Sequence, residues 1–552
     1  MNNFRSIRFL SVLFTFILLT TKVLPQQPVF TRQDTLRGSI TPERSWWDLT
    51  YYHLDIIVNP SDSTIYGTNT VYYRVLESKN IMQIDLQPPL VMISAMQNGE
   101  KLKIIHEGNA HFIHLNDNQI PGSVAYIIIE YGGRPRIAPN PPWQGGITWK
   151  RDKNNLPFIA SSCQGDGASL WWPCKDHMYD EPDSMLISVT VPDNLIDVSN
   201  GRLRSVVPNK KNKTKTWNWF VSSPINNYGV NINIGDYVHF SEKYNGEKGI
   251  LDCDYWVLSY NLNKAKVHFR QVPMMLKAFE YWFGPYPFYE DGYKLVEAPY
   301  LGMEHQSSVT YGNGYQNGYL GRDMSGTGWG DSWDFIIVHE SSHEWFANNI
   351  TYRDIADMWV HESFGNYSES LFVEYYNGKE AGAEYVRGTR RSILNDRPII
   401  GIYNVNYEGS GDMYSKGGNM LHTLRQIIND DVKWRDILRG LNSEFYHQTV
   451  DGWQIEEYIG KITSMNLKPF FDQYLRDVRI PVFEYYVKGD YLNFRWNNCV
   501  PGFNMPVRIY DGDIAINLNP SNRWNTIKLE TSNHDISVDK DYYISVLNMM
   551  GR

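Results

Sequence analysis

Two histidines four residues apart, with a glutamate directly after the first, constrain this chain more than any other feature. They lie in the segment 336–346 (IIVHESSHEWF), whose apolar residues recur at helical spacing. Side chains at positions i and i+4 share one face of a helix, so His339 and His343 can reach one metal ion. Glu340 is then close enough to act on a water molecule beside that ion. A helix with a solvated, charged face can also carry this HExxH pattern, so the pattern alone leaves both interpretations open.

A third acidic residue favours the metal interpretation. Glu362 is separated from His343 by 18 residues, a spacing that suits a second helix packed against the first. Its neighbours are largely aromatic, and burial of an unpaired carboxylate among them would be costly. Because a catalytic zinc ion takes three protein ligands and keeps one position open, we predict zinc ligation by His339, His343 and Glu362. Glu369, two helical turns after Glu362, is predicted either to accept the outer N–H of a ligating histidine or to be a solvated helix charge.

This ligand set predicts metal-assisted hydrolysis of a peptide bond. Zinc brings the pKa of a bound water towards neutrality, and Glu340 can accept the proton as the water attacks the carbonyl carbon. The same carboxyl group can then protonate the leaving amine. A hydrogen-bond donor should face the oxyanion, but residue spacing does not locate it.

Two further segments extend the pattern: residues 301–305 are LGMEH and residues 414–417 are YSKG. Together with HExxH and the distal glutamate, they resemble the motifs of the aminopeptidase N and leukotriene hydrolase family of gluzincin zinc metallopeptidases, and the resemblance covers most of residues 45–490. The first segment is similar to the family's GxMEN exopeptidase motif. The resemblance implies that Glu304 binds the free α-ammonium group of the substrate, and that Gly302 and Met303 lie as an edge strand beside the peptide. A carboxylate fixed one residue's length from the metal would admit only the first peptide bond of a chain.

The resemblance also assigns roles to three other residues. Tyr414 matches the tyrosine of the family's YxKG segment, which donates a hydrogen bond to the oxyanion. Gln164 precedes residues 172–176 (WPCKD) as a family glutamine precedes a similar segment, which implies a second contact to the amino end of the substrate. Tyr300 occupies a position that helps to wall the pocket for the first side chain in relatives.

Two places depart from the family pattern. His305 stands where the family has an asparagine after the amine-binding glutamate, and the third ligand is flanked by His361 and Ser363 instead of asparagine and glycine. Both departures leave the acidic residues in place. His305 is predicted to tune amine recognition or to titrate near neutrality, so the preferred first residue is not transferred from the family.

The distribution of patterns along the chain predicts an α+β multidomain protein. Residues 27–245 are expected to form a β domain, because apolar and polar residues alternate, as at Tyr52, Leu54 and Ile56. Residues 246–477 show helical periodicity, with helices expected at 432–441 and 453–462, the latter capped by Asp451. Residues 478–552 return to strands, including a hairpin at 482–496. The resemblance implies a β saddle, a thermolysin-like, mainly α catalytic domain and a small C-terminal β sandwich, without the long helical fourth domain of many relatives.

The N-terminal residues predict export. Arg5 and Arg8 precede an apolar run at 9–19 and then polar residues, which indicates a signal peptide over 1–26 and a secreted or periplasmic protein, with an uncleaved anchor as the alternative. The run is shorter than the roughly 20 residues of a membrane span, so no stable membrane insertion is expected. The 52 basic and 61 acidic residues give a net charge of −9, which argues against nucleic acid as a partner. The four cysteines form no CxxC pair, and support neither a disulfide scaffold nor a cysteine zinc site.

The predicted function is that of a zinc metalloaminopeptidase, with one Zn²⁺ per chain, acting on peptides with a free N-terminus. One alternative is a thermolysin-type endopeptidase, which would have no use for Glu304 in its GxMEN-like setting. The other is a catalytically silent peptide-binding protein, which would have no need of the full ligand and base set. A loop rich in glycine and aromatic residues at 310–333 is predicted to be either a mobile flap over the site or an irregular surface loop.

Overall fold

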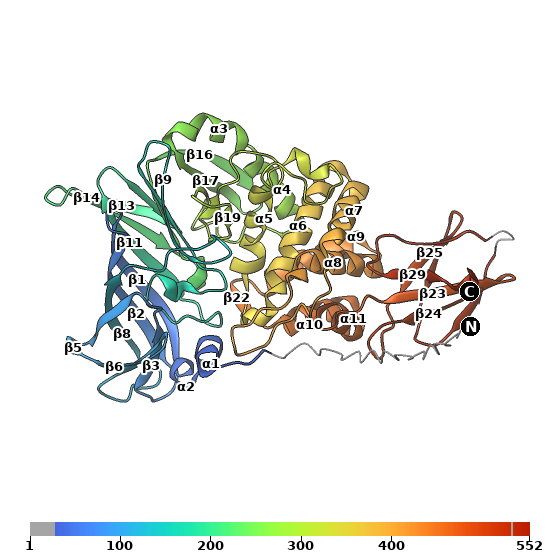
Figure 1. Ribbon diagram of the computed structural model, residues 1–552, viewed down its shortest axis with the longest axis horizontal. Coiled ribbons are helices and arrows are strands. Elements are labelled where there is room, and N and C mark those ends of the chain that lie inside the picture. The colour runs from blue at the N-terminus through green and yellow to red at the C-terminus, as the bar shows by residue number, and fades with distance from the viewer. Residues whose placement is uncertain (1–27, 531–533, 552) are drawn as a thin grey trace, which may run out of the picture.

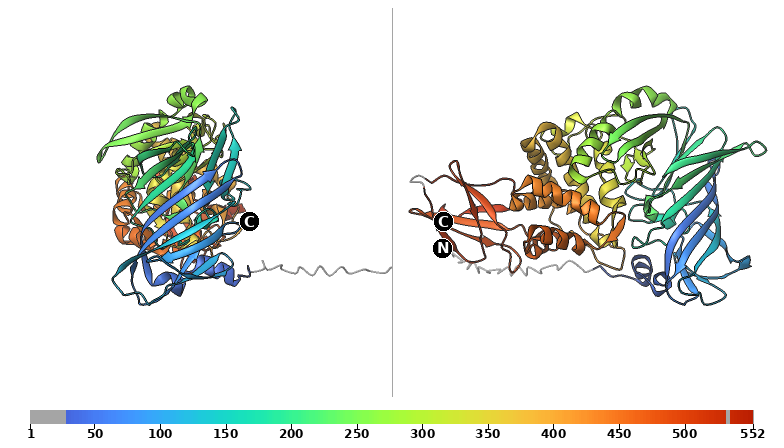
Figure 2. Two further views of the ribbon diagram at one scale, coloured as in Figure 1. Left: turned by 90° about the vertical axis from the view of Figure 1, so that its left-hand side faces the viewer. Right: turned by 180° about the vertical axis from the view of Figure 1, so that it is seen from behind.

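The computed structural model describes residues 28–530 and 534–551, so the predicted signal segment at 1–26 lies outside the described residues. The described chain forms three parts in a row: a β-rich N-terminal part, a helix-rich middle and a smaller β-rich C-terminal part (Figures 1 and 2). The chain is therefore a multidomain α+β protein, as the sequence predicts. In the part of the chain that the structure describes, no helix has the length and apolar character needed to cross a membrane.

The N-terminal part begins with two short helices, α1 (Arg32–Gly38) and α2 (Pro42–Ser45), and continues in three sheets. The eight strands of the largest sheet are, in spatial order, β13 (Arg202–Asn209), β14 (Thr214–Val221), β11 (Ser184–Pro192), β1 (Trp47–Asn59), β2 (Thr64–Val75), β8 (Val124–Gly133), β4 (Val91–Gln97) and β5 (Glu100–Lys101). The strands of the other two sheets are β12 (Ile196–Ser199), β15 (Ile232–Gly235), β10 (Pro157–Ser162) and β9 (Gly146–Arg151), and β3 (Ile81–Asp85), β7 (Ala110–His114) and β6 (Lys103–Glu107).

Strand β1 illustrates why these residues form a sheet. Tyr52, Leu54, Ile56 and Val58 are each no more than 1% exposed, while the residues between them are more exposed. Successive side chains of a strand point to opposite faces, so this alternation places one face of β1 on the core. The alternation predicted from the sequence is confirmed.

The middle part begins with a five-stranded sheet, whereas the sequence predicts mainly helices from residue 246 onwards. Its strands are, in spatial order, β16 (Tyr237–Gly246), β17 (Gly249–Leu258), β18 (Tyr293–Glu297), β20 (Val309–Tyr311) and β19 (Gly302–Met303). The domain boundary expected at 245/246 falls within β16, which pairs with β17 to its last residue. Every residue of β18 is buried, so this strand lacks the alternation that marks a half-buried strand in a sequence.

The helices of the middle part surround the HExxH segment. They are α3 (Leu262–His268), α4 (Gln271–Phe283), α5 (Phe335–Ser342), α6 (Trp359–Asn377), α7 (Lys379–Gly388), α8 (Ser415–Ile428), α9 (Asp431–Glu444), α10 (Gly452–Thr463) and α11 (Lys468–Leu475), with a small parallel pair of strands, β21 (Ile350–Tyr352) and β22 (Gln448–Val450). Helices α9 and α10 confirm the two helices predicted from the sequence. Asp451 is the N-cap of α10, and its backbone N–H donates to Oε1 of Gln454 (2.8 Å).

The C-terminal part contains two small sheets, and the predicted hairpin is confirmed as β23 (Val482–Lys488) and β24 (Tyr491–Asn497). The other strands are β25 (Val507–Asp511), β26 (Ile514–Leu518), β27 (Asn525–Lys528), β28 (Ile536–Val538) and β29 (Ser545–Asn548). One apolar core continues from the middle part into the C-terminal part, and a second fills the N-terminal part. The second core also includes Val296, Tyr300 and Met303, so the segment before Glu304 packs against the N-terminal part.

Candidate metal centre

Helix α5 presents the first two predicted ligands. The Asp334 carboxylate caps its start by accepting the N–H groups of Ile336 (2.9 Å) and Ile337 (3.2 Å). The helix ends at Ser342, and His343 follows with helical backbone angles (φ −68°, ψ −13°). The i, i+4 relation between the two histidines is therefore kept, and both face α6, which packs against α5.

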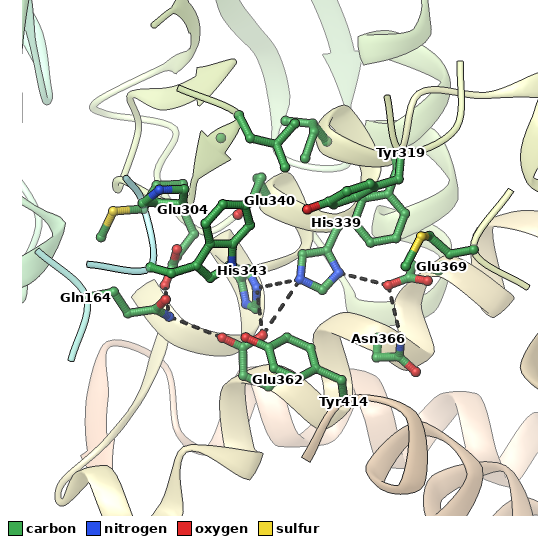
Figure 3. Close-up of a pocket in the computed structure, with 18 of the residues that line it drawn as sticks. Gln164, Glu304, Tyr319, His339, Glu340, His343, Glu362, Asn366, Glu369 and Tyr414 are labelled. Atoms are coloured by element: carbon green, nitrogen blue, oxygen red, sulfur yellow. Dashed lines mark hydrogen bonds and ion pairs between the residues drawn. The ribbon is translucent and has the colours of Figure 1, made fainter. Parts of the chain in front are cut away.

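The three predicted ligands converge on one point (Figure 3). The Nε2 atoms of His339 and His343 are 3.4 Å apart, and Oε2 of Glu362 lies 3.7 Å and 3.5 Å from them. A tetrahedral zinc ion with bonds of about 2.1 Å separates its ligand atoms by about 3.4 Å. Oε2 of Glu362 is buried without a hydrogen-bond partner among the described residues. A buried, unsatisfied oxygen at this spacing fits a zinc ligand.

Hydrogen bonds at the outer ring nitrogens orient both histidines. Nδ1 of His339 donates to Oε1 of Glu369 (2.8 Å), and Nδ1 of His343 donates to the carbonyl oxygen of Phe346 (3.0 Å). With the hydrogen on Nδ1, each Nε2 keeps its lone pair for a metal. Glu369 is fully buried, so its predicted supporting role is confirmed and the alternative of a solvated helix charge is wrong.

The cavity concentrates negative charge. Burial raises the pKa of Glu340 to about 7, and burial together with the charges of Glu340 and Glu362 raises the pKa of Glu304 well above its ordinary value. Burial alone would also raise the pKa of Glu362, but His343 and His339 lower it to about 2, so this carboxylate stays ionised. Burial lowers the pKa of His343 to about 4, which leaves the neutral imidazole that metals require. A cation among these groups would relieve the repulsion between the carboxylates.

The cavity beside the ligands has a volume of about 320 Å³. Glu340 and Tyr414 both line it. Tyr414 stands directly before α8, and its ring lies nearly parallel to the ring of His339, with centroids 6.2 Å apart. Burial raises the pKa of Tyr414 well above its ordinary value, so its hydroxyl keeps the proton it would donate. The structure thus places the predicted base and the predicted hydrogen-bond donor in one cavity.

At the other end of the cavity, Gln164 joins two carboxylates (Figure 3). Its Nε2 donates to Oε1 of Glu304 (2.6 Å) and to Oε1 of Glu362 (3.1 Å). Glu304 follows Gly302 and Met303 of β19, the edge strand of its sheet, and all of these residues line the cavity. Gln164 follows β10 of the N-terminal part, so the cavity is closed by residues from two parts of the molecule.

Two glycines let the backbone approach the reactive side chains closely. A Cβ atom on Gly302 would lie 2.6 Å from Cγ2 of Ile336 and 3.2 Å from Cγ of Glu340. A Cβ atom on Gly365 of α6 would lie 2.7 Å from Cε1 of His343. Neither position has room for a larger residue without displacing a side chain of the site.

Tyr300 lies behind the cavity and is not among the residues that line it. Its side chain is only 6% exposed, and its hydroxyl donates to the carbonyl oxygen of Ser161 (2.7 Å). It therefore does not form the wall for the first side chain that the family resemblance implies, because its ring packs into the apolar core of the N-terminal part.

His305 and His361, the two histidines at positions where the family has asparagine, are not among the residues that line the cavity. His305 is fully buried beside the hydroxyl of Tyr300 (3.2 Å), and burial lowers its pKa to about 4. The expectation that His305 titrates near neutrality is therefore wrong. Nε2 of His361 accepts the backbone N–H of Tyr352 (2.9 Å), so this residue has a structural contact.

Several residues of the site escape prediction from the sequence. Asn366 and Tyr385 donate to the Glu369 carboxylate (3.2 and 2.9 Å), and the ring of Phe335 stacks on that of His339 with centroids 5.1 Å apart. Asn366 lies four residues after Glu362, so helical spacing could have identified it. No local signal in the sequence identifies Tyr385.

The glycine-rich loop forms one wall of the cavity, through Tyr319 and Met324. Hydrogen bonds fasten it: Nε1 of Trp329 donates to Glu384 (2.8 Å), and Nη2 of Arg391 donates to the carbonyl oxygen of Met324 (2.9 Å). The loop therefore contributes residues to the wall of the cavity.

The arrangement of two histidines on one helix, a glutamate on the next and a further glutamate between the histidines resembles that of the gluzincin class of zinc metallopeptidases. The profile of the peptidase family M1 domain matches residues 269–474, which include the three ligands, Glu304 and Tyr414. Residues 269–474 are therefore similar to the peptidase family M1 domain.

Several known proteins are similar to this chain in sequence or in fold. The chain is 20% identical over 357 residues to tricorn protease-interacting factor F2 of Thermoplasma acidophilum, covering 61% of this chain and 43% of that one. It is 25% identical over 332 residues to leucine aminopeptidase 2 of Vanderwaltozyma polyspora, covering 56% and 46%. The chain thus spans less than half the length of these relatives. A variant of an M1 zinc metallopeptidase from Deinococcus radiodurans, solved with a Tyr-Ser-Ala substrate, shares the fold with a TM-score of 0.67 and 20% identity, covering 80% of this chain and 96% of that one.

Proposed function

We propose that the protein is a zinc metalloaminopeptidase that hydrolyses the first peptide bond of peptides with a free N-terminus. One zinc ion per chain would be held by His339, His343 and Glu362. The observation that supports the proposal most strongly is the pair of Gln164 and Glu304, since their side chains line the cavity beside the ligands, where the Glu304 carboxylate can pair with an ammonium group.

The chain's own residues divide the chemistry among them. Zinc, when bound, supplies Lewis acidity that polarises the scissile carbonyl group and acidifies water. Glu340 takes the proton from the attacking water and delivers it to the leaving amine. The Tyr414 hydroxyl donates a hydrogen bond to the oxyanion that develops on the carbonyl oxygen.

Substrate selection follows from the residues that line the cavity beside the ligands. The Glu304 carboxylate pairs with the α-ammonium group, and the Gln164 side chain holds that carboxylate and contacts the amino end. The free edge of β19, at Gly302 and Met303, runs beside the main chain of the peptide. A peptide seated in this way exposes only its first peptide bond to the metal.

The two alternatives considered from the sequence are not favoured. A thermolysin-type endopeptidase needs no carboxylate that pairs with an ammonium group beside the ligands, and Glu304 lines the cavity there. A silent peptide-binding protein would have no reason to keep three convergent ligands together with Glu340.

We also propose the finer domain assignment. The sheets of the N-terminal part form a β saddle, the middle part is a thermolysin-like catalytic domain, and the two small sheets after residue 477 form a β sandwich. Because β16 pairs with β17, we propose the first boundary between β15 and β16, at residue 236, in place of residue 245.

We propose that the protein is exported, secreted or periplasmic, and acts on peptides without a nucleic-acid partner or stable membrane insertion. The support is the sequence of residues 1–26, with Arg5 and Arg8 before an apolar run. Mass spectrometry of the mature N-terminus tests this: a new terminus near Gln26 is expected, and an intact Met1 in a membrane fraction would indicate the uncleaved anchor.

The main experiment compares amino-acid anilides with free and acetylated amino groups, with and without a zinc chelator. Chelator-sensitive cleavage of the free amines alone is the expected result. Cleavage of the acetylated anilides at similar rates would indicate an endopeptidase, and no cleavage of either would support a silent binding protein.

A further inference from the structure

A second groove adjoins the metal cavity and shares two residues with it. The groove has a volume of about 450 Å³, and Trp143 and Leu301 line both spaces. Its other walls are mainly apolar, from Pro141, Phe158, Tyr300 and Leu320. The two spaces therefore adjoin at Trp143 and at Leu301, which belongs to the segment that leads to Glu304.

The direction of this segment determines which part of a peptide would reach the groove. β19 pairs with β20 through Gly302 and Met303, and its other edge has no strand partner among residues 28–530 and 534–551. A peptide with its ammonium group at Glu304 that follows this free edge advances about 3.3 Å per residue. Its later residues then pass Gly302 and Leu301, and its third and fourth residues lie in the groove.

The groove exposes two large apolar side chains, and hydrogen bonds fix the backbone of one of them, Leu320. Trp143 is 60% exposed and Leu320 is 51% exposed. Leu320 has a φ of +50°, which is unfavourable for a leucine. Its N–H donates to Oδ1 of Asn313 (2.8 Å), and the fully buried Asn313 is fixed by its own bonds to the loop. Strained positions of this kind persist where the structure enforces them, which is most common at binding sites.

Lys150 gives the groove its charge, because it is the one charged side chain among the described residues that line it. Its Nζ donates to the carbonyl oxygen of Pro299 (2.8 Å), an uncharged partner. The ammonium charge is thus available at the wall of the groove, where it favours a carboxylate and disfavours a cationic side chain.

We propose that this groove binds the third and fourth residues of peptide substrates, selects apolar side chains at those positions, and pairs Lys150 with the terminal carboxylate of a tetrapeptide. The orientation of the peptide rests on the proposed aminopeptidase function. The preferred substrates are then short apolar peptides of about four residues.

The test uses two tetrapeptides that share their first two residues, Leu-Ala-Leu-Leu and Leu-Ala-Ser-Ser, on the full-length protein. The wild type should cleave the first bond of the apolar peptide with a kcat/KM about tenfold higher, the scale of one apolar contact in a substrate pocket. Leu320→Ser should bring this ratio close to one. Leu76→Ser, a matched change at a leucine that is 53% exposed and lies outside both spaces, should leave the ratio unchanged.

A second measurement addresses Lys150. The wild type should prefer the free acid of Leu-Ala-Leu-Leu over its C-terminal amide, and Lys150→Met should abolish this preference. A wild-type ratio of the two kcat/KM values near one, or a ratio that Leu320→Ser leaves unchanged, would contradict the proposed selection of apolar residues by the groove. A preference for the free acid that survives Lys150→Met would contradict the proposed pairing of Lys150 with the terminal carboxylate. Leucine anilide separates the two hypotheses, since failure to cleave it contradicts the aminopeptidase, whereas normal cleavage with no peptide preference contradicts the groove alone.

Discussion

At the scale of single residues, the carboxylates of Glu304, Glu340, Glu362 and Glu369 line one cavity. Each has different contacts, and these indicate a different role for each. Glu362 faces two histidines, Glu369 supports His339 from behind, and Glu304 accepts from Gln164. Glu340 lies on the cavity wall, and burial raises its pKa to about 7. The contacts single out Glu340 as the carboxylate that is placed to exchange protons with a substrate.

Glu340→Gln should therefore abolish most turnover and keep the metal. The amide has almost the same shape but cannot accept the proton of water, so we expect kcat on leucine anilide to fall by about 10²–10⁴-fold. Zinc content, measured by atomic absorption, should stay near one ion per chain because the three ligands are unchanged. Near-normal turnover would remove Glu340 from the reaction.

Tyr414→Phe tests the proposed hydrogen bond to the oxyanion. Loss of one such donor lowers kcat by about 10²–10³-fold, and KM should change much less, because the bond strengthens as the oxyanion forms. The ring is kept, so its stacking with His339 should be preserved. An effect confined to KM would contradict the assignment.

At the scale of elements, the sequence predicts the parts whose pattern is local. The α5 histidines, the α9 and α10 helices and the β23–β24 hairpin follow from spacing, caps and turns within a few residues. The sheet around β18 could not be predicted in this way, because its strands pair across long stretches of chain and β18 is buried throughout. The supporting contact of Tyr385 depends on how α7 packs on α6, and the burial of His305 depends on the N-terminal core, neither of which a single sequence displays.

The close approach of α6 to α5 gives a prediction at this scale. In Gly365→Ala the added Cβ meets the imidazole of His343, which must shift, so we expect zinc affinity to fall by about 10–100-fold, the scale of a disturbed ligand orientation. Competition with a chelator of known affinity measures this. Gly411→Ala is the matched control, because a Cβ there meets nothing within 4 Å; equal affinities for both variants would contradict the packing argument.

At the scale of the whole molecule, a zinc ion held by His339, His343 and Glu362 would join two helices that lie inside the core shared by the middle and C-terminal parts. A ligand that binds only the folded state stabilises it by about 4 kcal/mol at a thousand times its dissociation constant. Removal of zinc by a chelator should thus lower the melting midpoint, and added zinc should restore it. His343→Ala should melt at the same temperature with and without zinc; a zinc-dependent shift in that variant would place the stabilising ion elsewhere.

The position of Gln164 has a consequence for how such a protein can change over time. All three ligands lie within residues 339–362, whereas the amide that holds Glu304 belongs to the distant N-terminal part. The three candidate ligands and the amide that supports Glu304 are therefore inherited on separate stretches of sequence. Under the proposed function, a mutation at Gln164 loosens the hold on Glu304 and removes one contact to Glu362, although it replaces none of the three ligand residues.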